Sequence, residues 1–185
     1  NDVGHRLAQA IFDESRRLSR TVNDFLDYAR PKEPRKGPVP LAHILHQAVE
    51  FLDPELRKKD IEVRLQVPEE VCIDGDKDLV YRALYNLLAN ACQAMQEHGR
   101  ILVSWEEAEH ILSIDDQGPG FDPEMREKYI EPFFTTKDSG TGLGLAIVST
   151  IVANHGAHLR LGSAPGGGGR VQIVFPQSKV NCQGS

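Results

Sequence analysis

Cysteine is scarce and widely spaced in this sequence. The three cysteines, Cys72, Cys92 and Cys182, form no Cys-x-x-Cys pair. Zinc sites and the disulfide frameworks of small secreted proteins both need closely patterned cysteines. The spacing therefore argues against both kinds of structure, and we expect three reduced thiols, as in a cytoplasmic protein.

Basic charge and long apolar runs are also lacking. Asp and Glu outnumber Lys and Arg by 27 to 21, for a net charge of −6, so no basic field exists to attract nucleic acid. The longest apolar runs, such as residues 147–153, are far shorter than the roughly 20 residues of a membrane-spanning helix. The polar start Asn1-Asp2-Val3 does not resemble a signal peptide. We expect a soluble, cytoplasmic chain that makes no membrane contact of its own.

The front of the chain carries apolar side chains at heptad spacing. One row is formed by residues 8, 15, 22 and 29, and the next by residues 11, 18 and 25. This pattern is typical of a helix-bundle or coiled-coil seam. No glycine or proline interrupts residues 7–30, whereas the proline-rich residues 31–38 can continue neither helix nor sheet. The stripe favours self-association, and packing on the chain's own domain is the alternative.

Beyond residue 38, helical and strand patterns alternate. Apolar periodicity predicts helices at 41–58, 77–96 and 142–154, with Asp76 as the N-cap of the second. Strands are predicted at 61–67, 71–73, 100–106, 110–116, 158–162 and 170–175. This order predicts an α/β two-layer sandwich in which helices cover one face of a mixed sheet.

Four short blocks stand out from this background. They are residues 86–91 (Asn-Leu-Leu-Ala-Asn-Ala), 116–120 (Asp-Gln-Gly-Pro-Gly), 131–137 (Glu-Pro-Phe-Phe-Thr-Thr-Lys) and 140–145 (Gly-Thr-Gly-Leu-Gly-Leu). In the first, Asn86 and Asn90 are four residues apart on an apolar helix and project from one face. Carboxamide oxygens suit Mg²⁺, although buried asparagines can equally cap a neighbouring backbone group.

The second block suits the base of a nucleotide. Asp116 ends a predicted strand just before Gly118 and Gly120. A carboxylate there can accept a hydrogen bond from an amino group such as that of adenine, and glycines let the backbone approach a flat ring. A simple Asp-Gly turn is the alternative interpretation.

The last block suits phosphate. Gly140, Gly142 and Gly144 stand at alternate positions ahead of a predicted helix, where backbone N–H groups are free for phosphate oxygens. Lys137 precedes them as a mobile positive charge. The block matches neither the P-loop nor the Rossmann pattern, and serine/threonine kinase signatures are absent.

Two pairs of histidines are also spaced closely enough to hold a metal ion. His43 and His46 are three residues apart, as are His155 and His158. Because no third ligand is evident, we expect ordinary surface roles for all four.

In order and spacing, the four blocks resemble the ATP-binding catalytic domain of bacterial two-component sensor histidine kinases. This family is a branch of the gyrase, heat-shock chaperone and mismatch-repair ATPase superfamily. The resemblance covers roughly residues 39–176. It implies a five-stranded mixed sheet with three helices on one face, and it implies ATP and Mg²⁺ as ligands.

The resemblance also implies roles for single residues. Asn90 matches the family's Mg²⁺ ligand and Asp116 its adenine-binding aspartate. Residues 132–134 match the start of the family's flexible lid over ATP. We expect the lid to span about Asp122 to Thr141, because this segment is rich in glycine, charge and turn residues and lies between two of the blocks. The implied nucleotide-binding residues are Asn86, Asn90, Asp116, Gly118, Gly120, Phe134, Thr136, Lys137, Gly140, Thr141, Gly142, Leu143 and Gly144.

Residues 1–30 are similar to the second helix of the stem through which such kinases form homodimers as a four-helix bundle. The implied organisation continues with a linker at 31–38, the catalytic domain at 39–177 and a tail at 178–185. The family's phosphoacceptor is a histidine followed by an acidic residue, but His5 is followed by Arg6. We therefore expect the acceptor and its helix to be absent, and no catalytic residue is assigned. Gly169 departs from the family where a threonine often helps to hold adenine.

The leading hypothesis is transfer of the γ-phosphoryl group of ATP to a stem histidine, for relay to an aspartate of a response regulator receiver domain. The chain alone is then unable to phosphorylate itself. An ATP-hydrolysing clamp is one alternative, but such relatives have a water-activating glutamate where Asn86 stands. A non-catalytic module is another, against which the intact Asn90, Asp116 and Lys137 argue.

Overall fold

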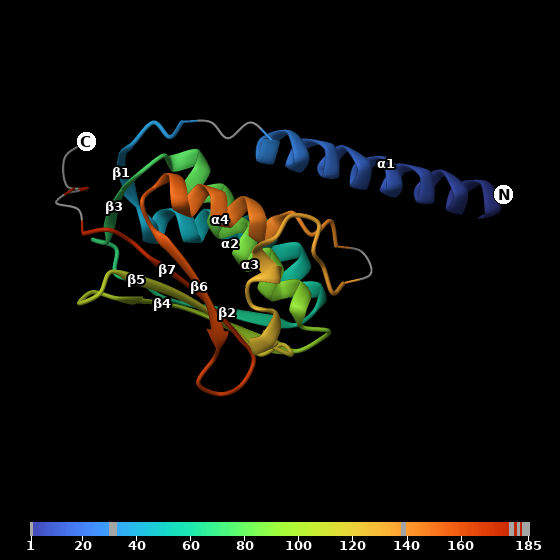
Figure 1. The fold of residues 1–185 in the computed structure, drawn as a ribbon. Helices are drawn as coiled ribbons and strands as arrows, with labels where there is room; N and C mark the ends of the chain where they lie inside the picture. The colour runs from blue at the N-terminus through green and yellow to red at the C-terminus, as the bar shows by residue number, and fades with distance from the viewer. Residues whose placement is uncertain (1, 30–32, 138–139, 178–179, 181, 183–185) are drawn as a thin grey trace.

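The chain begins with one long helix that projects from the rest of the molecule. In a computed structural model, which describes residues 2–29, 33–137, 140–177, 180 and 182, helix α1 runs from Asp2 to Ala29 (Figure 1). It lies against α4 (Gly144–Asn154), and the ring centroids of Phe25 and Phe133 are 6.4 Å apart. The large apolar side chains on and beside the heptad rows are between 47% and 62% exposed: Leu7, Ile11, Phe12, Leu18, Val22, Phe25 and Leu26. The predicted apolar stripe is present and largely uncovered by the described part of the chain.

A small two-stranded sheet begins within the expected linker. β1 (Gly37–Pro40) pairs antiparallel with β3 (Cys72–Gly75). We expected residues 31–38 to join neither helix nor sheet, which is wrong for Gly37 and Pro38. Each strand of a two-stranded sheet has one unpaired edge. A proline, which has no N–H to donate, fits where its nitrogen faces that edge.

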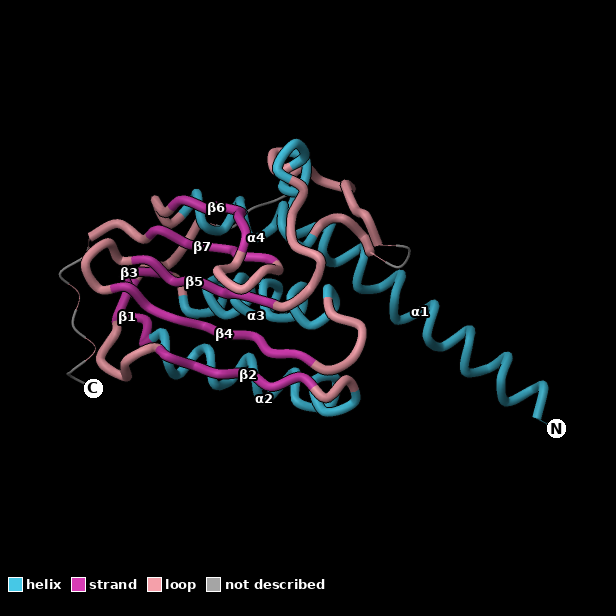
Figure 2. Tube along the Cα trace, turned by 90° about the horizontal axis from the view of Figure 1, so that it is seen from below, coloured by secondary structure: helices cyan, strands magenta, loops and turns pink. Residues whose placement is uncertain are grey.

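Five strands form the main sheet, in the order β2-β4-β5-β7-β6. Their bounds are β2 Ile61–Gln66, β4 Gly99–Glu106, β5 Ile111–Asp116, β6 His158–Ser163 and β7 Gly169–Val174. β2 pairs parallel with β4, and the other pairings are antiparallel. Helices α2 (Leu41–Lys58), α3 (Lys77–Ala94) and α4 cover one face (Figure 2). The predicted α/β two-layer sandwich with a mixed five-stranded sheet is confirmed.

The apolar core fills the space between helices and sheet. Its fully buried side chains include Leu45 of α2, Leu84 and Leu88 of α3, and Leu112 and Ile114 of β5. The three helices after residue 38 begin and end within two residues of the expected bounds because their apolar stripes face this one core.

Asp76 begins α3, as expected of an N-cap. Its Oδ1 accepts hydrogen bonds from the backbone N–H groups of Asp78 and Leu79, at 3.1 and 3.2 Å. Its Oδ2 accepts a 2.8 Å bond from the N–H of Arg35 in the linker. Partial burial raises the pKa of Asp76, but these three donors outweigh burial and hold the pKa below its ordinary value.

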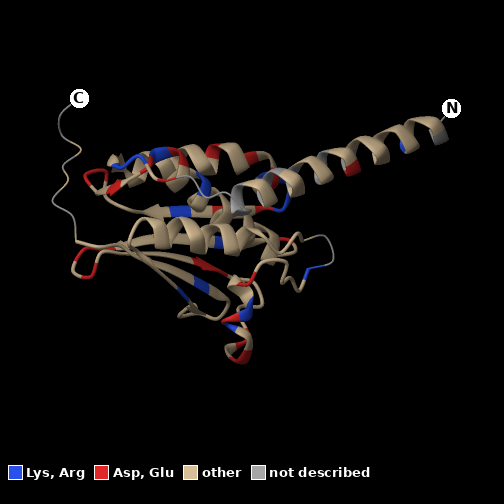
Figure 3. Cartoon of the chain, turned by 45° about the horizontal axis from the view of Figure 1, so that its top comes forward, with Lys and Arg blue, Asp and Glu red and all other residues tan. Residues whose placement is uncertain are grey.

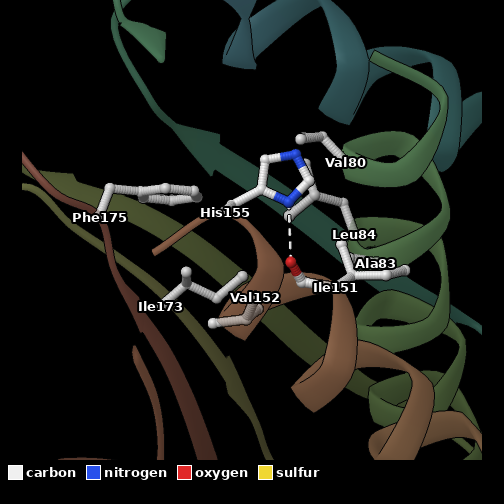
Figure 4. A pocket seen from close by; sticks show the side chains of 8 residues that line it. All are labelled: Val80, Ala83, Leu84, Ile151, Val152, His155, Ile173 and Phe175. Carbon is white, nitrogen blue, oxygen red and sulfur yellow. Dashed lines mark hydrogen bonds between the residues drawn. The ribbon is translucent and has the colours of Figure 1, made fainter. Parts of the chain in front are cut away.

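His155 is buried, which corrects the expectation of a surface role. Only 3% of it is exposed, at the end of α4. It lines a small, mostly apolar cavity between α3, α4 and the last strand with Val80, Ala83, Leu84, Ile151, Val152, Ile173 and Phe175 (Figure 4). Its ring is satisfied by hydrogen bonds to two backbone groups, of Asp76 and Ile151. Sequence spacing could not show this because the partner from α3 is distant along the chain.

Two of the cysteines form a disulfide. Cys72 of β3 is bonded to Cys182, with their Cα atoms 5.7 Å apart, while Cys92 is free and buried. The expectation of three reduced thiols is therefore wrong for this pair. The two residues are 110 positions apart, and spacing rules detect only cysteines that are close in sequence.

Blue Lys and Arg positions and red Asp and Glu positions are interspersed along the ribbon in Figure 3. Among the residues that the structure describes, no helix combines the length and the apolar composition needed to cross a bilayer.

Candidate nucleotide-binding site

Asn86 and Asn90 lie on the side of α3 that faces the first residue of α4. A Cβ atom placed on Gly144 would lie 3.4 Å from Nδ2 and 3.6 Å from Oδ1 of Asn90, and 3.7 Å from Oδ1 of Asn86. Nδ2 of Asn86 donates a 2.9 Å hydrogen bond to the carbonyl of Arg82, one turn back on α3. The helical spacing therefore brings both carboxamides to the same point of the glycine-rich turn.

The carboxamide oxygens of Asn86 and Asn90 are a type of ligand that suits Mg²⁺. Carboxamide oxygens are hard and neutral, and glycine at 144 keeps the space in front of them open, since a Cβ there would contact both. Among the described residues, no three His, Cys, Asp or Glu side chains gather as a metal site. A cation held by Asn90 would take its other ligands from water and phosphate oxygens.

Asp116 lies at the end of β5 and is 7% exposed. Its Oδ1 accepts hydrogen bonds from the N–H of Gly118 at 2.8 Å and of Gly169 at 3.3 Å. The first of these is the Asp-Gly turn of the alternative interpretation, and it leaves Oδ2 without a partner in the described chain. Burial raises the pKa of Asp116 above its ordinary value, which the two backbone donors only partly offset.

The glycines around Asp116 allow three segments to meet. A Cβ on Gly118 would lie 2.9 Å from Cβ of Ala94, at the end of α3. Gly120 has φ +78° and approaches the carbonyl of Gly168. A Cβ on Gly169 would lie 2.6 Å from Oδ2 of Asp116, so glycine at this position leaves the free carboxylate oxygen room.

The glycine-rich turn is fixed by the backbone. Gly142 has φ +69°, and a Cβ on it would lie 2.8 Å from the carbonyl oxygen of Phe133. The N–H of Phe133 donates a 3.0 Å bond to the carbonyl of Gly142. Leu143 is fully buried and begins α4 without a side-chain cap, although its own N–H reaches Oγ1 of Thr141 at 3.4 Å. An uncapped helix N-terminus offers N–H groups to an anion.

The segment expected to be a lid contains two short 3₁₀ helices, Pro123–Met125 and Lys128–Ile130. Tyr129 packs edge-on against Phe121 and Phe134, with ring centroids 5.1 and 5.5 Å apart. Phe134 is therefore an anchor of this segment. Thr136 is exposed, and no described contact joins it to the other candidates. Residues 138 and 139 of the expected lid lie outside the described residues.

Lys137 reaches from this segment to α3. Its Nζ lies 3.3 Å from Oε1 of Gln93 and 3.5 Å from the carbonyl oxygen of Asn90. Burial lowers the pKa of Lys137, and the attraction of the Asp116 carboxylate opposes that effect. Sequence reasoning did not name Gln93, although its place three residues after Asn90, on the same face of the helix, was a usable signal.

A second residue that sequence reasoning missed is Asp115. It points to the other side of the sheet from Asp116 and binds Arg170 through two hydrogen bonds, of 2.7 and 2.6 Å. The pair joins β5 to β7 one residue before Asp116 and one residue after Gly169. Such a bidentate contact fixes the register of the two strands beside the candidate adenine contact.

Comparison with known proteins agrees with this geometry. Residues 75–179 match the family model of the histidine kinase-, DNA gyrase B- and HSP90-like ATPases. The chain is 33% identical over 175 residues to the sensor histidine kinase ZraS of Escherichia coli O157:H7, covering 93% of this chain and 38% of ZraS. It therefore spans well under half the length of that relative.

Solved structures show the same fold. The mycobacterial sensor histidine kinase MprB is 33% identical, with a TM-score of 0.68, over 76% of this chain and 97% of that one. The histidine kinase ThkA, crystallised with the response regulator protein TrrA, is 25% identical with a TM-score of 0.78, over 91% of this chain and 50% of that one. The chain thus belongs to the histidine kinase-, DNA gyrase B- and HSP90-like ATPase family, as an ATP-binding catalytic domain of the sensor histidine kinase type.

Proposed function

We propose that this domain transfers the γ-phosphoryl group of ATP to a histidine on a dimerisation stem. The observation that carries the proposal is that four segments meet at one place. Gly144 lies against the carboxamide of Asn90, Lys137 bonds to the carbonyl of the same asparagine, and the charge of Asp116 acts on Lys137. Phosphoryl transfer depends mainly on positioning and on neutralising charge, and this set of groups provides both.

Each group has a role in this proposal. Oδ2 of Asp116 accepts a hydrogen bond from the amino group of adenine, since it has no partner in the described chain. Asn90 holds Mg²⁺, with Asn86 beside it, and the bound cation neutralises phosphate charge. Lys137 and the N–H groups at the start of α4 bind phosphate oxygens. Phe134 anchors the lid through Tyr129.

The front of the chain supplies part of the stem. We propose that α1 is the second stem helix, that residues 31–38 form the linker, and that residues 39–177 form the catalytic domain ahead of the tail. The exposed stripe of α1 supports pairing with other stem helices in a homodimer. The ThkA structure contains a response regulator, which supports a receiver domain as the partner that takes the phosphoryl group from the stem.

An ATP-hydrolysing clamp is less well supported. Hydrolysis needs a group that activates water, and the residue one turn before Asn90 is Asn86, a neutral amide whose Nδ2 is already bonded to Arg82. We expect ATP hydrolysis by the chain to be slow.

Phosphorylation in trans tests the proposal. The chain would be incubated with γ-labelled ATP alone, with an added stem peptide that carries a histidine followed by an acidic residue, and with the same peptide after His→Ala substitution. We expect acid-labile label on the histidine peptide only, at a rate that rises with peptide concentration because no tether holds the two together. Acid-labile label on the chain itself, above all at His5, or none on any peptide despite ATP binding, contradicts the proposal.

A further inference from the structure

Lys59 lies where α2 gives way to β2, and its side chain crosses to the end of α3. Its Nζ donates hydrogen bonds to the carbonyl oxygens of Cys92 and Met95, at 2.9 and 2.7 Å. The last carbonyls of a helix have no partner within the helix, and they lie at the negative end of its dipole. An ammonium group at this place satisfies two of them and opposes the dipole.

The turn that Lys59 binds forms one wall of the nucleotide site. Asn90 faces Gly144, and Gln93 accepts the hydrogen bond from Lys137. Ala94 lies against Gly118, since a Cβ there would be 2.9 Å from Cβ and 3.0 Å from the carbonyl oxygen of Ala94. The residues that face the candidate metal site, the lid and the adenine loop therefore all lie at 90–94, and the two carbonyls that Lys59 binds belong to this turn and to the residue after it.

The backbone of Lys59 is itself held in place. Its carbonyl accepts a 2.7 Å hydrogen bond from the N–H of His98. The neighbouring Asp60 binds Nδ1 of the same histidine at 2.7 Å. The backbone that carries the Lys59 side chain is therefore held in place, and this side chain has less conformational freedom than that of an ordinary surface lysine.

We propose that Lys59 is a positioning residue for nucleotide binding. It touches neither base nor phosphate, and it holds the last turn of α3 in the place that Asn90, Gln93 and Ala94 need. The inference rests on the proposed nucleotide site. Without the ammonium group, two carbonyls at the helix end lose their partner, and the last turn frays.

Calorimetry on the whole chain tests this role with adenosine and with Mg-ATP. Lys59→Met keeps the length of the side chain but removes the donors, and Lys59→Arg restores donors and charge. Lys58→Met is the matched control, because Lys58 is adjacent and exposed. We expect Lys59→Met to weaken both ligands by about threefold to tenfold, a change of about 0.7 to 1.4 kcal/mol. Lys59→Arg and Lys58→Met should stay within about twofold of the unchanged protein.

The two ligands separate positioning from direct contact. A loss confined to Mg-ATP, with adenosine binding intact, means that Lys59 touches phosphate and overturns the proposal. So does a lower Tm with both affinities unchanged, which shows a purely structural role. If the unchanged protein binds neither ligand, the proposed nucleotide site itself is wrong, an outcome distinct from both of these.

Discussion

Nε2 of His155 accepts a hydrogen bond from the backbone N–H of Asp76, at 2.9 Å. Its Nδ1 lies 2.7 Å from the carbonyl oxygen of Ile151, which can only accept, so Nδ1 carries the proton and the ring is the neutral tautomer. The imidazole therefore joins the N-cap of α3 to the last turn of α4. These are the two helices whose other ends form the nucleotide site.

Replacing His155 by leucine should destabilise the domain. The substitution leaves the N–H of Asp76 without an acceptor in an apolar place, at a cost of about 1 to 3 kcal/mol in the free energy of unfolding. Urea denaturation measures the loss, with His158→Leu on exposed strand β6 as a control that should change by less than about 0.5 kcal/mol. Equal stability of the two variants contradicts the role assigned to His155.

Asp116 should determine the affinity for adenine nucleotides. Asp116→Ala removes a charged hydrogen-bond acceptor from a buried place, which is worth about 1.5 to 3 kcal/mol, or at least about tenfold in ATP affinity. Asp116→Asn should lose as much because the charge is gone, yet its amide oxygen can still accept from Gly118. Titration calorimetry tests both variants beside Asp74→Asn on β3. An ATP affinity that survives in Asp116→Asn shows that the carboxylate is not the contact.

Protonation of Asp116 should weaken ATP binding but stabilise the folded chain without nucleotide. The pKa of Asp116 is raised by burial, so ATP affinity should fall as pH is lowered through that raised value. Without nucleotide, the same shift makes the folded state bind the proton more tightly, so stability is lost as pH rises from the unfolded pKa through the folded one.

The pKa of Lys137 is lowered by burial, so ATP affinity should also decline on the alkaline side, at a pH below the ordinary lysine pKa. The ATP affinity and the stability of the Asp116→Asn variant would be measured over the same pH range and subtracted from those of the unchanged protein, which isolates the contribution of Asp116 on the acid side. A difference that does not vary with pH rules out Asp116 as the cause.

Residues 122–141 should respond to ligand. The described residues of this segment form two short 3₁₀ helices, the ring contacts of Tyr129 and a few hydrogen bonds such as those of Lys137, so the segment opens at little cost without nucleotide. Amide hydrogen exchange in it should slow when Mg-ATP is added, while exchange in β6 stays constant. Equal protection of the segment with and without nucleotide means that it is not a lid.

The Cys72–Cys182 bond should make stability depend on redox conditions. A disulfide that closes a loop of this length stabilises a domain by about 2 to 4 kcal/mol, so oxidised protein should melt about 5 to 10 °C higher than protein treated with a thiol reductant. Cys182→Ser should melt at the lower temperature under both conditions. Peptide mapping after alkylation checks the pairing itself, and free thiols at both positions under oxidising conditions contradict it.

The fold followed from the sequence because its signals are local. The apolar stripe that contains Leu84 and Leu88 repeats at the helical period, and Asp76 caps α3 through residues two and three positions away. The candidate site was found in the same way, since each of its blocks is a continuous run of a few residues. The signals for the fold and those for the candidate site both connect residues that are only a few positions apart in the sequence.

What sequence reasoning missed depends on contacts between distant segments. Lys59 meets the end of α3, Arg170 meets Asp115, and His155 meets Asp76, at separations of 33 to 79 residues. Only the folded chain brings such pairs together, and a lysine or a histidine at these positions has no local pattern that marks it. The disulfide partner of Cys72, Cys182, was not predicted for the same reason.

The small sheet of β1 and β3 ties the segment before α2 to the start of α3. β1 begins at Gly37, inside the expected linker, and β3 ends one residue before Asp76, whose carboxylate accepts a 2.8 Å hydrogen bond from the N–H of Arg35. The chain from Arg35 to Pro40 is therefore held against the start of α3 at two places, by the hydrogen bond of Arg35 and by the pairing of β1 with β3. Because α3 bears Asn90 near its opposite end, under the proposed function a force applied at the start of α3 reaches the candidate metal site along one continuous helix.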